Sequence, residues 1–430
     1  MIRFLYNLLF PLALLLFLPG YTLKMLRRGN YRNKFGQRLG FYDQATRARL
    51  ASGRITWLHA VSVGEVMIAL KLAAKMKELE PDLQVALTTT TTTGFSLAQK
   101  EARPWIEVLY TPLDFWPIMR RAFTIIRPAR IALVEAEVWP NLTAIAHQQK
   151  IPLALVNARL SPRSESRFRK FNFFVRPYFR KLDLICVQDE EDAARWHSLG
   201  ADSARIQVVG SIKFDPANVD PKPDKPRAVL QAVGIDAGRP ILLAGSTHQG
   251  EEEIMGNIFL QLRPAFPTLF LVIAPRHVER TKEILTALEG LGVSCMRRSR
   301  TVSALPPDCL LLDTTGELRD WYALATVVFV GKSLTARGGQ NPVEAIVAHR
   351  PVVFGPHMEN FSSLARALVA VGGALQPNDE RELAEALRGL LQDSEKRRDL
   401  ADRAHAILEP HQGATNRTAR LLEKLPPHTA

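Results

Sequence analysis

The sequence predicts two α/β domains, each doubly wound around a parallel sheet. In both halves of the chain, short apolar runs that resemble strands alternate with longer stretches that resemble helices, which is the pattern of βαβ units. A segment rich in proline and aspartate interrupts this alternation at residues 215–230, after which the alternation restarts. With 430 residues, the chain is also longer than a single hydrophobic core usually supports.

The amino terminus is strongly apolar. No residue from Phe4 to Leu23 carries a charge, and a helix of this length can cross a bilayer, although Pro11 and Pro19 also allow a kinked span or a shallow insertion. The basic residues that follow are Lys24, Arg27, Arg28, Arg32, Lys34 and Arg38. By the positive-inside rule, we expect residues 1–33 to form a single-pass membrane anchor with a basic collar and the rest of the chain to be cytoplasmic.

Charge and cysteine content narrow the function classes. The formal net charge of +13 indicates an anionic partner such as nucleic acid, phospholipid or a phosphorylated substrate. The three cysteines, Cys186, Cys295 and Cys309, form no C-x-x-C motif, so we expect reduced thiols and no zinc site.

The first domain, expected over residues 34–214, contains the leading catalytic candidate. Residues 55–79 read as an apolar strand, a turn and a long amphipathic helix, and Glu65 lies in that turn. A carboxylate at the carboxyl end of a strand lies where open α/β sheets bind their ligands. The same residues, Ser62 to Glu65, also spell a capping box, in which Glu65 would only satisfy the helix start.

Further strand ends in this domain carry polar residues. The threonine run is expected to continue a strand as far as Gly94, and a later apolar run ends in Glu135 and Glu137. Lys213 follows another apolar run. Helix capping for Glu135 and a surface position for Lys213 are the simpler interpretations.

The second domain, expected over residues 231–412, has small, polar or basic residues after each strand. Each such segment can be a turn glycine with a helix cap, but four of them in one domain indicate a nucleotide site. The candidate residues are Ser246, Thr247, Pro275, Arg276, Gly316, Glu317, Leu318, Gly338, Gly339, Asn341, Pro342, Val343 and Glu344. The last stretch, residues 413–430, is expected to be a helix that can cross back to the first domain.

The expected nucleotide site carries no metal signature. No Asp-x-Asp pair occurs anywhere in the chain, so we expect no metal site and no cofactor. Lys213 and Arg276 are the candidates for neutralising a departing phosphate.

Two doubly wound domains with nucleotide signals in the second resemble the GT-B glycosyltransferases, whose domains face a cleft. The chain more closely resembles the bacterial Kdo transferases, which move 3-deoxy-D-manno-octulosonic acid (Kdo) from CMP-Kdo to the lipid A precursor lipid IVA. The matching segments run in order along the chain and are YRNKFGQRLGFY, HAVSVGEV, EAEVWPN, NARLS, GSIKFD, GSTHQGEEE, APRH, TGEL and RGGQNPVEA.

This resemblance implies roles for the candidate residues. Glu65 matches the general base of an inverting, metal-independent transfer, and Glu135 and Lys213 match positions that assist the transition state. Pro275 and Arg276, residues 316–318 and residues 341–344 match the CMP-binding segments, in which Glu344 would bind the ribose.

The resemblance also implies partners and a location. The expected partners are CMP-Kdo as donor substrate, lipid IVA as acceptor and the cytoplasmic face of the inner membrane. The residues expected to contact acceptor phosphates, if they are more than a solvated face, are Arg163, Arg167, Arg169, Lys170, Arg176 and Arg180.

Two other functions are compatible with the residues. One is a GT-B enzyme that uses another nucleotide sugar, such as a UDP-sugar transferase or an epimerase. The other is a membrane-tethered protein that binds nucleic acid, which the net charge allows, but the basic residues form no recognised nucleic-acid motif.

Overall fold

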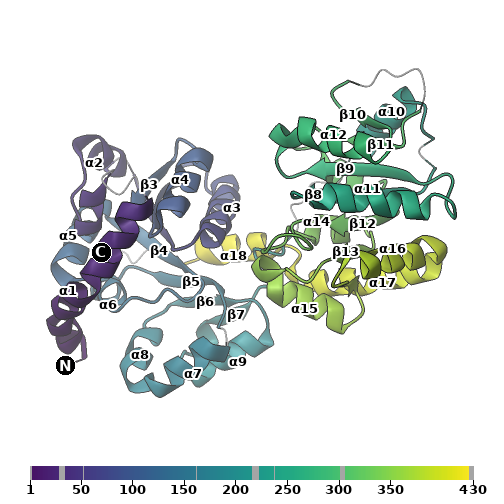
Figure 1. The fold of residues 1–430 in the computed structure, drawn as a ribbon. Helices are drawn as coiled ribbons and strands as arrows, with labels where there is room; N and C mark the ends of the chain where they lie inside the picture. The colour runs from purple at the N-terminus through teal and green to yellow at the C-terminus, as the bar shows by residue number, and fades with distance from the viewer. Residues whose placement is uncertain are drawn as a thin grey trace. The chain divides into compact units, whose positions relative to one another are not determined.

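The computed structural model describes residues 2–28, 34–51, 53–160, 162–215, 222–236, 238–300 and 306–425. The chain divides into two compact units, shown in Figure 1: unit 1 is Met1–Asp215 with His411–Ala430, and unit 2 is Pro216–Pro410. Each unit has one seven-stranded parallel sheet, which confirms the predicted α/β class.

The sheet of unit 1 has the strand order β3-β2-β1-β4-β5-β6-β7. Its strands are β1 (Ile55–Ala60), β2 (Gln84–Thr89), β3 (Ile106–Tyr110), β4 (Pro128–Val134), β5 (Leu153–Ala158), β6 (Leu184–Val187) and β7 (Ile206–Val208). The chain winds outward in one direction from β1 and in the other from β4. The carboxyl ends of these two neighbours therefore form the switch point of the sheet, where open α/β sheets place their ligands.

The helices of unit 1 connect these strands and cover the sheet. They are α1 (Ile2–Arg28), α2 (Gln44–Leu50), α3 (Val63–Leu79), α4 (Thr92–Glu101), α5 (Trp116–Ile126), α6 (Pro140–Gln148), α7 (Pro162–Lys170), α8 (Asn172–Phe179), α9 (Glu190–Ser198) and α18 (Ala414–Glu423). Strand β2 ends at Thr89 rather than continuing to Gly94, because the Thr91 side chain accepts a hydrogen bond from Gly94 N and starts α4.

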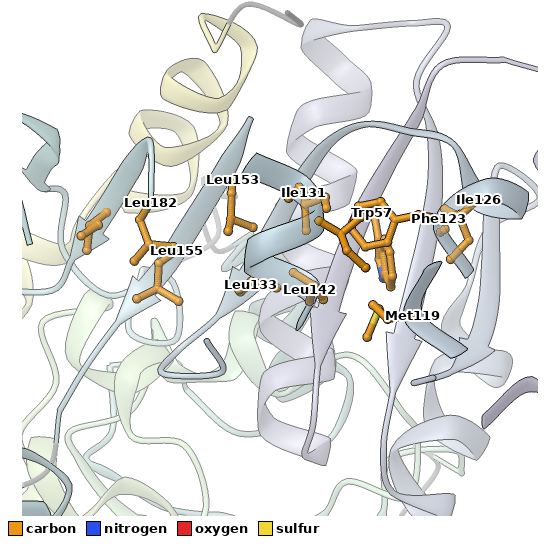
Figure 2. Packing of buried hydrophobic residues seen from close by; sticks show 14 of the residues in the cluster. Trp57, Met119, Phe123, Ile126, Ile131, Leu133, Leu142, Leu153, Leu155 and Leu182 are labelled. Atoms are coloured by element: carbon orange, nitrogen blue, oxygen red, sulfur yellow. The ribbon is translucent and has the colours of Figure 1, made fainter. Parts of the chain in front are cut away.

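The core of unit 1 lies on both faces of its sheet. Along β1, Ile55 and Trp57 join one cluster and Leu58 and Ala60 join another, as the two-residue period of a strand requires. Figure 2 shows the first cluster, in which Trp57 meets the ring of Phe123 edge-on at 5.3 Å. The polar atom of this indole is satisfied too, since Trp57 Nε1 donates to Thr88 Oγ1 at 2.9 Å.

The sheet of unit 2 has the order β10-β11-β9-β8-β12-β13-β14, so its switch point lies between β8 and β12. Its strands are β8 (Ile241–Thr247), β9 (Phe270–Pro275), β10 (Cys295–Arg297), β11 (Cys309–Leu311), β12 (Val327–Val330), β13 (Val352–Phe354) and β14 (Ala374–Leu375). Its helices are α10 (Asp224–Ala232), α11 (Glu251–Leu262), α12 (Thr281–Gly290), α13 (Leu318–Tyr322), α14 (Val343–Val347), α15 (Ser362–Ala370), α16 (Glu380–Gln392) and α17 (Ser394–Leu408).

The expected linker over residues 215–230 is partly wrong. Residues 216–221 lie outside the described residues, but α10 already begins at Asp224. It buries Pro226, Val229 and Leu230, and Pro226 stands in the first turn, where a helix tolerates proline, so burial of apolar side chains decides the structure here.

The expected membrane-spanning anchor is not supported. A helix, α1, does occupy this part of the chain, but no helix in the described residues is both long and apolar enough to cross a bilayer. The first turns of α1 instead pack on other elements of unit 1: Phe10 stacks on Phe115 at 5.4 Å, and Asn7 Nδ2 donates to Asn141 Oδ1 at 3.0 Å. Of the expected basic collar, Arg32 lies outside the described residues.

Helix α18 is part of unit 1 and packs on α3, with Ala419 and Leu422 in the core. Its start is held by Asp215, whose carboxylate oxygens accept hydrogen bonds from Gly413 N at 2.7 Å and Thr415 N at 2.8 Å. Asp215 is only 6% exposed, so these bonds are shielded from water.

We expect Asp215→Ala to lower the free energy of unfolding of unit 1 by about 2 kcal/mol or more, because the N–H groups of Gly413 and Thr415 lose a buried, charged acceptor. Five of the six tryptophans lie in unit 1, so fluorescence during urea denaturation reports this unit. The exposed Asp82, changed to Ala, is the matched control. Equal midpoints for the two variants would contradict the role given to Asp215.

Candidate active site

Glu65 lies in the first turn of α3, directly after β1. Ser62 Oγ accepts a hydrogen bond from Glu65 N at 3.3 Å, and the Glu65 carboxylate accepts from Val61 N at 2.8 Å and Ser62 N at 3.2 Å. The capping interpretation of this motif is therefore confirmed. An ionised carboxylate offers about four acceptor positions, so two remain for another donor. The cap thus fixes the orientation of Glu65 without exhausting its capacity as a base.

Glu135 follows β4, the strand next to β1. Its backbone is in the left-handed region with φ of 62°, and its N–H donates to Val156 O at 2.9 Å, which turns the chain sharply at the strand end. Burial raises the pKa of the Glu135 carboxyl, and the charge of Glu65 raises it further, whereas Arg159 and Lys213 lower it. Four charged groups therefore gather at the switch point of unit 1.

Lys213 is the cation predicted for this site, and the structure brings it to Glu135. Burial lowers the pKa of its ammonium group, and the charge of Glu135 opposes that effect. The loop that carries Lys213 is anchored by Asn157, whose Oδ1 accepts from Ile212 N at 2.9 Å. The three residues predicted as catalytic, Glu65, Glu135 and Lys213, thus share one edge of one sheet.

Glu137 is a functional candidate that the sequence analysis noted but did not select. Burial, followed by the charges of Glu65 and Glu135, raises the pKa of the Glu137 carboxyl to about 7. A carboxyl group with this pKa can hold a proton near neutral pH and can donate or accept it. The signal in the sequence was the spacing of two glutamates directly after an apolar strand.

In unit 2, the ends of β8 and β12 are joined through one carboxylate. Glu251 is fully buried, and its carboxylate accepts hydrogen bonds from the backbone N–H groups of His248 at 2.8 Å, Lys332 at 2.7 Å, and Ser333 and Leu334 at 3.0 Å each. Because His248 N–H is already used, it is not available to a phosphate. Glu251 instead holds the two loops of the switch point in register.

The predicted nucleotide residues at the ends of β8 and β9 lie in different environments. Thr247 is fully buried, and its hydroxyl donates to Glu252 Oε1 at 2.9 Å, so it has a structural contact. Ser246 is half-buried with φ of 56°. Pro275 is buried, whereas the Arg276 side chain is exposed and its backbone N–H donates to Thr247 O at 3.0 Å.

The remaining nucleotide candidates follow β11 and β12. Gly316 has φ of 88°, and Glu317 Oε2 accepts from Arg298 Nε at 3.0 Å. The carboxylate of Glu344 pairs with Arg319 at 3.2 Å, and Asn341 Oδ1 accepts from Val343 N at 3.1 Å. Pro342 and Val343 are buried.

Gly338 and Gly339 have φ of 121° and 69°, which side-chain-bearing residues rarely adopt. A Cβ atom on Gly339 would lie 2.4 Å from Met358 Sδ, so the loop also lacks room for a side chain there. Since these loops follow parallel strands, all of the nucleotide candidates lie at the carboxyl edge of the sheet of unit 2.

The described residues contain no group of three or more His, Cys, Asp or Glu side chains that could hold a metal ion. The predicted acceptor-contact residues on α7 and α8, Arg163, Arg167, Arg169, Lys170, Arg176 and Arg180, are all exposed. Between them, Phe171 and Phe173 are 48% and 73% exposed, so cationic and aromatic groups share this surface.

Comparison with known proteins identifies one family model and several relatives that match this chain. A family model described as 3-deoxy-D-manno-octulosonic-acid transferase (kdotransferase) matches residues 33–216. The 3-deoxy-D-manno-octulosonic acid transferase of Bordetella pertussis is 36% identical over 85% of this chain and 86% of its own length. The protein of the same name from Haemophilus influenzae is 32% identical over 98% of both chains.

Among solved structures, UDP-GlcNAc 2-epimerase from Neisseria meningitidis bound to UDP-GlcNAc matches 86% of this chain and 100% of its own, with a TM-score of 0.54 and 15% identity. This likeness shows the fold alone, which is GT-B-like.

The raised pKa of Glu137 predicts a pH-dependent stability. The unfolded carboxyl releases its proton near pH 4.5 and the folded one near pH 7, so Glu137 destabilises the fold increasingly as pH rises through this window. We expect Glu137→Gln to be more stable than the parent protein by roughly 1–3 kcal/mol at pH 8 and by much less at pH 4.5.

Denaturant unfolding at the two pH values measures this difference. The matched control is Glu190→Gln, which alters an exposed glutamate of the same unit. A stability gain for Glu137→Gln that is the same at both pH values would show that Glu137 is not protonated in the folded protein.

Proposed function

Because the chain belongs to the family of 3-deoxy-D-manno-octulosonic acid transferases, we propose that it transfers Kdo from CMP-Kdo to the lipid A precursor lipid IVA, in lipopolysaccharide core biosynthesis. The observation that supports this most directly is the gathering of Glu65, Glu135 and Lys213 at the switch point of unit 1. A sugar hydroxyl is a poor nucleophile until a base takes its proton, and carboxylates are suited to that task.

In the proposed reaction, Glu65 accepts the proton of the acceptor hydroxyl while the hydroxyl oxygen bonds to the anomeric carbon of Kdo. The bond from that carbon to the phosphate oxygen breaks, and its electron pair leaves with CMP. Because the hydroxyl attacks on the face opposite the departing CMP, the anomeric centre is inverted. The hydrogen bonds from Val61 N and Ser62 N hold the Glu65 carboxylate in place, so the base is already oriented before the reaction begins.

Charges on both units support this chemistry in our proposal. Lys213 offsets the negative charge of the Kdo carboxylate or the departing phosphate, and Glu135 stabilises the cationic character of the sugar ring. In unit 2, Arg276 presents an exposed guanidinium that can bind the CMP phosphate through two hydrogen bonds. Glu344 can accept hydrogen bonds from the ribose hydroxyls. The lack of any Asp-x-Asp pair supports neutralisation by these cations without a divalent ion.

We also propose that α1 lies in the cytoplasmic leaflet of the inner membrane instead of crossing it. Its exposed large apolar side chains are Phe4, Leu5, Leu8, Leu9, Leu12, Leu14, Leu15 and Leu16. A patch of exposed apolar side chains along one helix is typical of interfacial helices, which bind through apolar burial and attraction to anionic lipid. The surface of α7 and α8 has the same mixture of groups.

The direct test incubates the purified protein with CMP-Kdo and lipid IVA and weighs the lipid by mass spectrometry. The proposal expects a mass gain of one or more Kdo units together with release of CMP. UDP-GlcNAc is the comparison donor. An unchanged lipid mass with CMP-Kdo, or transfer from the UDP-sugar alone, would refute the proposed function.

We expect Glu65→Gln to lower kcat by roughly 10²- to 10⁴-fold, because the amide cannot accept the proton. The KM for CMP-Kdo should stay the same, since the donor site lies in unit 2. The matched control is Ser62→Ala, which removes the other half of the cap and costs about 1 kcal/mol of stability but keeps the carboxylate. Equal losses of kcat in both variants would reduce Glu65 to a helix cap.

We expect Arg276→Ala to raise the KM for CMP-Kdo about tenfold or more, because a charge-assisted contact with the phosphate is lost. Arg276→Lys should restore part of the lost affinity for CMP-Kdo, since lysine keeps the positive charge but cannot form the bidentate contact. Arg388→Ala, an exposed substitution on α16 of the same unit, is the control. An unchanged KM for Arg276→Ala would exclude the guanidinium from donor binding.

A further inference from the structure

An open groove runs between α1 and the start of α5 in unit 1. Its volume is about 480 Å³, within the usual size range of ligand sites. Its lining residues are Arg3, Phe4, Asn7, Leu8, Phe115, Trp116 and Pro117. Most of these side chains are apolar, and Leu8 and Trp116 are 58% and 43% exposed, so the groove leaves apolar surface open to solvent.

The two walls of the groove are fixed to each other. Phe10 of α1 stacks on Phe115 at 5.4 Å, and Asn7 Oδ1 accepts a hydrogen bond from Trp116 N at 3.0 Å. The groove therefore exists before any ligand arrives, and little ordering opposes binding in it.

The polar end of the groove is tied to the segment that carries the carboxylates. Arg3 Nε and Asn7 Nδ2 both donate to Asn141 Oδ1 at 3.0 Å, and Asn141 N donates to Asp114 at 2.9 Å. Asn141 stands in the first turn of α6, four residues after Glu137. The groove thus opens at the edge of the sheet at which Glu65 and Glu135 lie.

Cations lie at the rim. The guanidinium of Arg120 stands over the indole of Trp116, 5.6 Å from the ring centre. Arg3 Nη2 is shielded from solvent and has no hydrogen-bond partner among the described residues. An apolar slot with arginines at its margin is complementary to an amphiphile whose head carries phosphate.

We propose that this groove holds an acyl chain of the lipid acceptor and so positions its sugar head for the reaction. The inference rests on the proposed function, because it assumes a lipid-linked acceptor. The exposed apolar residues of α1 continue from the groove along the helix, which gives an acyl chain an apolar surface to follow out of a bilayer. An acceptor lipid fits better than a bulk phospholipid, because the polar end of the groove leads to the catalytic carboxylates.

The first test is photo-crosslinking with an acceptor that carries a diazirine on one acyl chain, using the full-length parent protein in detergent. Adducts are expected on the peptides that contain residues 3–8 and 115–117. Adducts confined to residues 12–16 would overturn the proposal, because they report general contact with lipid. Loss of the groove adducts when excess phosphatidylglycerol is added would assign the groove to bulk lipid and also overturn it.

The second test blocks the groove. We expect Leu8→Trp to lower kcat/KM for the acylated acceptor about tenfold or more, because it displaces a few methylene groups from apolar contact. The value for the deacylated, phosphorylated saccharide should change less than about twofold. The matched control is Val208→Trp, which enlarges an apolar residue on β7 that is 44% exposed.

An equal loss with both acceptors, or no loss with either, would overturn the groove assignment. A failure of the proposed function looks different, since the parent protein would then transfer Kdo to neither acceptor.

Discussion

The strand order of the two sheets is the constraint on which the rest of this molecule depends. In each unit the winding direction reverses between two central strands, so the connections leave that stretch of the carboxyl edge uncovered. In unit 1 the residues placed there are Glu65 after β1 and Glu135 after β4. In unit 2 they are the loops after β8 and β12. The positions of chemically active groups therefore follow from topology before any individual contact is considered.

The glutamates at the two switch points differ in how their negative charge is compensated. In unit 2, Glu251 is surrounded by four backbone N–H groups, so its charge is fully satisfied and serves to brace two loops. In unit 1, three glutamates share one region with Lys213, and burial leaves their charges only partly compensated. The first arrangement suits rigidity, and the second suits proton transfer, since a carboxyl that titrates near neutral pH can change its state during a reaction.

The sequence predicted the parallel sheets and the cap at Glu65 because both depend on local patterns: alternating apolar runs, and a serine three residues before a glutamate. It did not single out Glu137, because the pKa of that carboxyl arises from burial and from charges contributed by other strands. The amino-terminal helix was expected from apolar length alone, but Asn7 and Phe10 direct one side of it onto α5 and α6. The linker was assigned by its prolines, whereas the burial of Val229 and Leu230 decides its structure. In each miss, a tertiary contact outweighed a local signal.

Helix α18 completes the core of unit 1 although it is encoded after the whole of unit 2. On the ribosome, the first 215 residues consequently emerge without the helix that packs on α3, and the apolar face of α3 that α18 covers stays exposed while about 195 further residues are translated. Unit 2 is contiguous and can fold during this interval. Complete folding of unit 1 is thus coupled to the end of translation. Chains truncated before α18 keep an exposed apolar surface of the kind that chaperones and proteases recognise.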